Sequence, residues 1–162
     1  MSLENVKRYF ETVNLDQQII QFKESTATVE EAAEALGCHP RQIAKTMSFF
    51  INERPILIVI AGDTRIDNKK YKDTFHQKAK MIPSEYVEDY IGHIPGGVCP
   101  FAIKSDVIVY LDISLKRFEN VYPAAGNGHS AVNLSLDELE KYSHYIKWVD
   151  VCKNWYINEE NK

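Results

Sequence analysis

Several patterns that would mark a particular class of protein are missing from this sequence. The chain has three cysteines, Cys38, Cys99 and Cys152, and no pair of them has CxxC spacing. An odd number of cysteines without framework spacing is typical of a reducing compartment and argues against a disulfide scaffold. The histidines have no metal-ligand spacing with cysteines or carboxylates. We therefore expect no metal site.

Signals for secretion, membranes and nucleotide binding are missing as well. No signal peptide opens the chain, and no apolar run reaches the roughly 18 residues of a membrane-spanning helix. Neither a P-loop nor a GxGxxG motif is present, so we expect no cofactor. The net charge of −4 argues against strong non-specific attraction to DNA or RNA. We expect a cytoplasmic protein in which any RNA contact comes from a local patch or is shared with a partner.

What remains is a composition suited to one globular domain over residues 1–162. Hydrophobic residues make up 44% of the chain and charged residues 26%, and no linker or repeat divides it. Apolar runs at 55–61 and 107–111 predict strands. Helices are expected at 3–13, 28–36, 68–75, 83–92 and after residue 135, with N-caps at Thr28, Asp67, Ser84 and Ser135. Strands and helices mix without strict alternation, which predicts an α+β fold with a mixed, barrel-like sheet of about six to seven strands surrounded by helices.

One glycine- and proline-rich stretch, residues 96–101 (Gly-Gly-Val-Cys-Pro-Phe), is a candidate site. Adjacent glycines allow backbone angles and close approaches that other residues do not. Pro100 fixes its own φ and favours an extended conformation at Cys99. Such a segment can direct several backbone N–H groups into one space and so bind an oxyanion or a carbonyl. A tight turn before a strand is the alternative interpretation.

A second candidate is Lys45, in the stretch Ile-Ala-Lys-Thr-Met at 43–47. Burying a lysine is costly, so a lysine beside buried strands either extends to solvent or points into a pocket. In a pocket its ammonium would donate to a substrate carbonyl or ester.

A third candidate is the basic cluster Lys69, Lys70 and Lys72 on the helix expected at 68–75. In a chain of net negative charge, this cluster predicts either a solvated helix face or a surface that binds tRNA phosphates.

Three segments together resemble the YbaK/prolyl-tRNA-synthetase-associated editing family. They are Ile-Ala-Lys-Thr at 43–46, the loop at 96–101, and Asn-Leu-Ser-Leu-Asp-Glu-Leu at 133–139. The resemblance covers residues 25 to 145. The family's lysine matches Lys45, and its Gly-x-x-x-Pro loop matches Gly96 and Pro100. Several relatives carry asparagine after the lysine, where this chain has Thr46.

This resemblance implies hydrolysis of the ester bond in mischarged aminoacyl-tRNA by a free-standing domain acting in trans. The expected substrate carries a Cys-, Ala- or Ser/Thr-type error on a non-cognate tRNA such as tRNA-Pro. A synthetase discriminates poorly against small differences because one methylene is worth only about 1–3 kcal/mol, so a second hydrolytic pocket corrects the error. A non-catalytic module of the same fold that binds tRNA or a synthetase is the alternative. An aminoacyl-tRNA synthetase is a second candidate partner.

The residues expected to act follow from the resemblance and from local chemistry. Lys45 and the backbone of Gly97, Val98, Cys99 and Pro100 are the catalytic candidates, and Thr46, Gly96, Phe101 and His129 are the substrate-binding candidates. Cys99 is either a nucleophile or a packing thiol, since nothing local suggests a lowered pKa. His129 is either a donor or base at the pocket or a surface residue. Met47, Phe49 and Ile60 are the candidates for lining the pocket.

Overall fold

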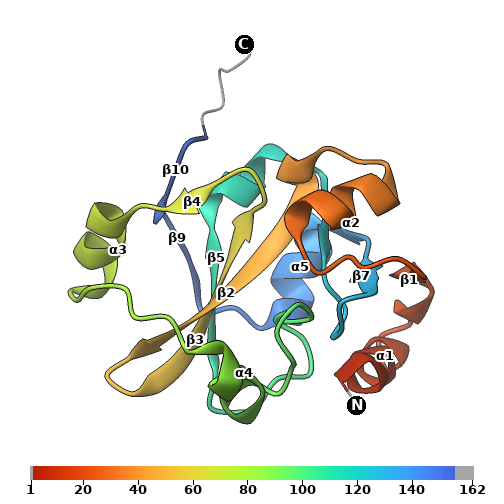
Figure 1. The fold of residues 1–162 in the computed structure, drawn as a ribbon, viewed down its shortest axis with the longest axis horizontal. Coiled ribbons are helices and arrows are strands. Elements are labelled where there is room, and N and C mark those ends of the chain that lie inside the picture. The colour runs from red at the N-terminus through yellow and green to blue at the C-terminus, as the bar shows by residue number, and fades with distance from the viewer. Residues whose placement is uncertain (1, 156–162) are drawn as a thin grey trace.

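The computed structural model describes residues 2–155, and a long antiparallel hairpin forms the middle of its main sheet (Figure 1). Strand β2 (Ile43–Ile51) pairs with β3 (Arg54–Ala61), with Ala44 opposite Ala61 at one end. The turn residues Asn52 and Glu53 both have positive φ, which suits the right-handed twist of a two-residue hairpin. In β3 every residue after Arg54 is buried, as the continuous apolar run predicts.

Four more strands complete a six-stranded sheet in the order β8-β6-β2-β3-β5-β9. On one side, β5 (Ile108–Asp112) runs parallel to β3, and β9 (Lys147–Val149) runs parallel to β5. On the other side, β6 (Asn120–Pro123) runs parallel to β2, and β8 (Leu134–Ser135) runs antiparallel to β6. The sheet is mixed and curled, which confirms the predicted fold class.

Two short ribbons flank the main sheet. Strand β1 (Ile19–Gln21) pairs with β7 (Ser130–Val132), and β4 (Arg65–Ile66) pairs with β10 (Cys152–Lys153), both antiparallel. Neither β4 nor β10 was expected, because a two-residue strand has no periodic pattern and depends on a partner far along the chain.

The helices are short, and most begin where the sequence predicts. They are α1 (Ser2–Glu11), α2 (Val29–Leu36), α3 (Asn68–Phe75), α4 (Ser84–Ile91) and α5 (Leu136–Ser143), with 3-10 turns η1 (Asp16–Gln18), η2 (Pro40–Gln42) and η3 (Ile113–Arg117). Thr28 and Ser135 form capping boxes, and the Asp67 side chain caps α3. The prediction for Ser84 was wrong: Pro83 holds the N-cap position, and Ser84 is already helical. No helix in residues 2–155 is long and apolar enough to cross a membrane.

The two faces of the sheet carry separate hydrophobic clusters. On one face α1 contributes Phe10, whose ring centroid lies 4.8 Å from that of Phe101. On the other face α3 contributes Tyr71, whose ring centroid lies 5.2 Å from that of Phe49. Phe101, a predicted substrate-binding residue, therefore belongs to the core, as do Phe49 and Ile60, which were expected to line the pocket. Each of these side chains is almost completely buried by packing against another element.

Candidate active site

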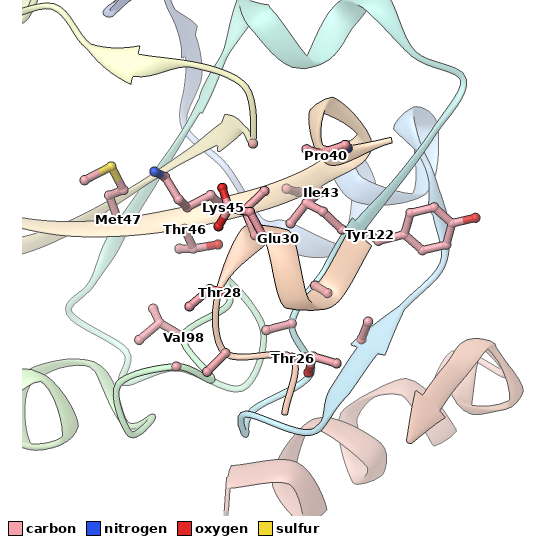
Figure 2. A pocket seen from close by; sticks show the side chains of 18 of the residues that line it. Thr26, Thr28, Glu30, Pro40, Ile43, Lys45, Thr46, Met47, Val98 and Tyr122 are labelled. Atoms are coloured by element: carbon pink, nitrogen blue, oxygen red, sulfur yellow. The ribbon is translucent and has the colours of Figure 1, made fainter. Parts of the chain in front are cut away.

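A cavity of about 800 Å³ opens beside the start of β2. Its walls come from segments that are distant in sequence. They include residues 26–32 around the start of α2, residues 43–47 of β2, residues 62–66 after β3, the loop at 96–98, and further residues at 40, 122, 124 and 130–131. Its volume lies within the range of about 300–1,000 Å³ that is typical of small-molecule sites. Figure 2 shows side chains from α2, β2 and the loop at 96–101 around this space.

Lys45 is positioned by the pairing of β2 with β3, where it lies opposite Ile60. Its neighbour Ala44 packs into the core, and alternation along the strand turns the Lys45 side chain to the other face. Residues from both faces, 43–47, border the cavity. The Lys45 side chain is half-buried, and no hydrogen bond or ion pair holds its ammonium among residues 2–155. A cation without a protein partner in a cavity is available to a substrate.

The loop at 96–101, called the glycine loop below, borders the same cavity with Gly96 and Val98. Gly96 has a φ of +90°, which favours glycine. Gly97 packs against the next loop so tightly that a Cβ there would lie 2.4 Å from the Asn127 Cα. The Gly97 N–H donates to the Ile94 carbonyl over 3.0 Å, so it is engaged, whereas the N–H groups of Val98 and Cys99 have no partner among residues 2–155. Of these two residues only Val98 borders the cavity, so its N–H is the loop donor left for an oxyanion.

The rest of the loop faces away from the cavity. Cys99 is completely buried, and this burial raises the pKa of its thiol to about 12. Its Sγ lies 3.5 Å from Nε2 of the buried His93, and that Nε2 donates to the Phe101 carbonyl over 2.7 Å. Burial also lowers the pKa of His93, so a neutral imidazole faces a neutral thiol. This environment is that of a packing thiol and lacks the lowered pKa of a nucleophile.

Pro100 and Phe101 line a second cavity of about 300 Å³, which includes Tyr9 of α1. Neither residue borders the cavity that contains Lys45. The loop thus divides between two sides, with Gly96 and Val98 facing one cavity and Pro100 and Phe101 facing the other.

Thr46 and Met47 border the main cavity beside Lys45 (Figure 2). The Thr46 hydroxyl is buried and has no hydrogen-bond partner among residues 2–155. Buried polar groups are nearly always paired, so this hydroxyl is a candidate for contact with a substrate.

Besides Gly97, Cys99, Pro100 and Phe101, four more predicted residues lie outside the cavity lining. His129 is exposed, and its Nδ1 donates to the Glu24 carbonyl over 2.9 Å. On α3, Lys69 forms an ion pair with Asp73, Lys70 forms an ion pair with Asp150, and Lys72 is exposed.

Glu30, Asp63 and Arg65 also line the cavity, and sequence reasoning missed all three as site residues. Glu30 is exposed in the first turn of α2 and makes no ion pair within the described part of the chain. Asp63 accepts hydrogen bonds from the two terminal guanidinium nitrogens of Arg117, at 2.7 and 3.0 Å. The predicted N-cap at Thr28 puts Glu30 in the first turn of a helix. The sequence does not show that this turn lies beside Lys45, because the two are brought together only in the folded protein. Residues 2–155 contain no group of three His, Cys, Asp or Glu side chains that could hold a metal.

Comparisons with known proteins identify relatives of this chain. Residues 23–142 match the family of aminoacyl-tRNA editing domains. The Bacillus subtilis protein YwhH, named as uncharacterized, is 47% identical over 156 residues that cover 96% of this chain and 99% of that one. A proline–tRNA ligase of Limosilactobacillus fermentum is 30% identical over 125 residues, which cover 73% of this chain and 22% of the ligase. This chain therefore corresponds to a small part of that enzyme.

A solved structure gives the same fold. It is described as that of a proposed trans-editing enzyme for prolyl-tRNA synthetase, and it superposes with a TM-score of 0.84 at 25% identity. The superposition covers 94% of this chain and 98% of that one. The two chains therefore share one fold over almost their whole matched lengths.

Proposed function

This chain belongs to the aminoacyl-tRNA editing domain family, and from that premise we propose that it is a trans-acting aminoacyl-tRNA deacylase. Its proposed substrate is a non-cognate tRNA such as tRNA-Pro that carries cysteine, alanine, serine or threonine by mistake. It would act in the cytoplasm as a free-standing domain, with a synthetase as a second partner.

One observation carries the proposal: Lys45 and the glycine loop, about fifty residues apart, line one cavity. Ester hydrolysis needs a bound carbonyl, a water and donors for the developing oxyanion. The Lys45 ammonium and the N–H group of Val98 are available donors of this kind. No nucleophilic side chain is required.

The proposed reaction adds a water oxygen to the ester carbonyl carbon. The C–O bond to the terminal ribose then breaks, and the released ribose oxygen takes up the proton that the water gives up. Lys45 holds the carbonyl or the terminal ribose, while the loop stabilises negative charge on the carbonyl oxygen. A ribose hydroxyl next to the ester orients the water, since that group both donates and accepts hydrogen bonds.

Glu30 gives the cavity a carboxylate near this lysine (Figure 2). The free α-ammonium of an aminoacyl ester is the complementary charge, so Glu30 is placed to bind it. A substrate with a blocked amino group would lose this contact. Glu30 therefore favours aminoacyl-tRNA over N-acylated tRNA.

The test is single-turnover hydrolysis of a panel of mischarged tRNAs by the wild type and by Lys45→Ala. We expect Lys45→Ala to lower the rate at least about a hundredfold, as loss of one oxyanion donor does elsewhere. Lys147→Ala, which removes an exposed lysine on β9, is the matched control and should hydrolyse like the wild type. Unchanged rates in Lys45→Ala would remove Lys45 from the mechanism.

The same panel distinguishes the enzyme from a binding module. If the wild type binds tRNA but hydrolyses none of the esters, the chain is a non-catalytic module. Adding N-acetylated aminoacyl-tRNA tests Glu30, because Glu30→Gln should slow hydrolysis of the free-amine substrate more than that of the acetylated one.

A further inference from the structure

The β4–β10 ribbon places two positive charges side by side. Arg65 on β4 lies directly opposite Lys153 on β10. Cross-strand partners project from the same face of a ribbon, and like charges in this position destabilise the pairing. Both side chains are exposed, and neither forms an ion pair among residues 2–155. The ribbon therefore presents two exposed positive charges on one face.

The nearby carboxylates are committed to other groups. Asp63 is held by Arg117, and Asp150 pairs with Lys70 at 3.1 Å. Asp67 accepts the N–H groups of Lys69 and Lys70, which keeps its pKa below the usual value, with Lys153 adding a smaller attraction. The ribbon therefore keeps a net positive charge on a protein whose overall charge is −4.

The ribbon also adjoins the cavity. Arg65 lines the wall that residues 62–66 contribute, and Figure 1 shows β4 and β10 together on the route from the sheet to α3. A cavity of about 800 Å³ suits an aminoacyl group and one nucleoside, so the remaining nucleotides must leave across its rim. Arg65 stands on that rim. No α3 lysine lines the cavity, Lys69 and Lys70 already form ion pairs, and Lys70 also donates to the Cys152 carbonyl of the ribbon.

We propose that Arg65 and Lys153 bind backbone phosphates of the single-stranded 3′ end of tRNA where it leaves the cavity. This inference rests on the proposed function for the identity of the ligand. It assigns the main phosphate contact to the β4–β10 ribbon and leaves the lysines of α3 a secondary role.

The test is the dissociation constant of uncharged tRNA, measured against salt concentration. Each lost phosphate contact on a single strand lowers the slope of log K against log salt by about 0.7. We expect Arg65→Gln and Lys153→Gln each to weaken binding by roughly two- to fivefold at low salt and to lower the slope. The double variant should lower the slope by about 1.4, since it removes two such contacts.

Two controls make the result specific. Lys23→Gln removes one exposed positive charge three residues before the lining residue Thr26 and should leave the slope unchanged. Lys153→Arg keeps the charge and should bind like the wild type. A double variant with the wild-type slope, or an equal loss in Lys23→Gln, would overturn the proposal.

This experiment is independent of hydrolysis because the tRNA carries no ester. If the wild type hydrolyses no mischarged tRNA but the double variant still lowers the slope, the proposed function fails and the phosphate site stands. If hydrolysis is confirmed but the slope does not change, only the phosphate site fails.

Discussion

The two sides of the loop at 96–101 differ in how their polar groups are satisfied. On the cavity side, the Lys45 ammonium and the Thr46 hydroxyl have no partner within residues 2–155. On the core side, His93 Nε2, Cys99 and the Phe101 carbonyl contact one another, and the Phe101 ring packs against α1. The buried Nδ1 of His93 is the one polar atom named there without a partner within residues 2–155. One side leaves polar groups open to a cavity, and the other is packed in the core.

Because of this difference, we expect neighbouring loop residues to have separate roles, some in stability and some in activity. The packed side fixes the loop against α1, which holds Gly96 and Val98 in place at the cavity. Substitutions on the packed side should therefore cost stability first. Substitutions on the cavity side should change activity while the protein remains folded.

The largest expected effect on stability is that of Phe101→Ala. The Phe101 side chain is 1% exposed and contacts the Phe10 ring, so its removal leaves a cavity in the core. We expect the free energy of unfolding in urea to fall by about 3–5 kcal/mol. Lys45→Ala should unfold close to the wild type. A loss below about 1 kcal/mol for Phe101→Ala would show that the core side does not anchor the loop.

A second effect depends on pH through Cys99. Its pKa rises from an ordinary value near 9 to about 12 in the folded protein, so the fold favours the protonated thiol. Above pH 9 the unfolded chain loses this proton while the folded protein keeps it. The stabilising contribution is thus complete below pH 9 and is lost as the pH rises towards 12, by about 1.4 kcal/mol per pH unit.

Comparison with Cys99→Ala isolates this effect, because Tyr71 also has a raised pKa and remains in both proteins. Between about pH 8 and 10, urea unfolding should show a steeper loss of stability in the wild type than in the variant. Equal slopes would mean that the thiol is not held protonated by the fold. Hydrolysis by Cys99→Ala should persist, and its loss would restore the nucleophile interpretation.

Local patterns in the sequence predicted much of the fold. The caps at Thr28, Asp67 and Ser135 and the apolar run of β3 depend on neighbouring residues, so one stretch of sequence is enough to identify them. Ser84 was misplaced by one position because a proline and a serine at a helix start both suit the N-cap region.

The cavity was harder to predict because pairing over long distances builds it. The resemblance pointed to Lys45 and the glycine loop, and the structure shows which loop residues border the cavity and which lie in the core. Glu30 and Arg65 have no local signal for a site. The strand that carries Arg65 pairs with β10, where its partner Lys153 lies 88 positions later along the chain. A local sequence pattern cannot predict a pairing over that distance.

The smallest expected effect on stability, and the sharpest test of the comparison, is that of Thr46→Val. Valine has nearly the shape of threonine and removes a buried hydroxyl that has no partner among residues 2–155. Leaving a buried polar group unpaired costs about 1–3 kcal/mol, so the variant should unfold at the same or a slightly higher urea concentration. If that hydroxyl contacts the substrate, hydrolysis should fall although stability does not. Thr46→Ser restores the hydroxyl and should recover the rate. A Thr46→Val protein that is both less stable and fully active would show that the hydroxyl serves the core, and the division between the two sides would not hold at this position.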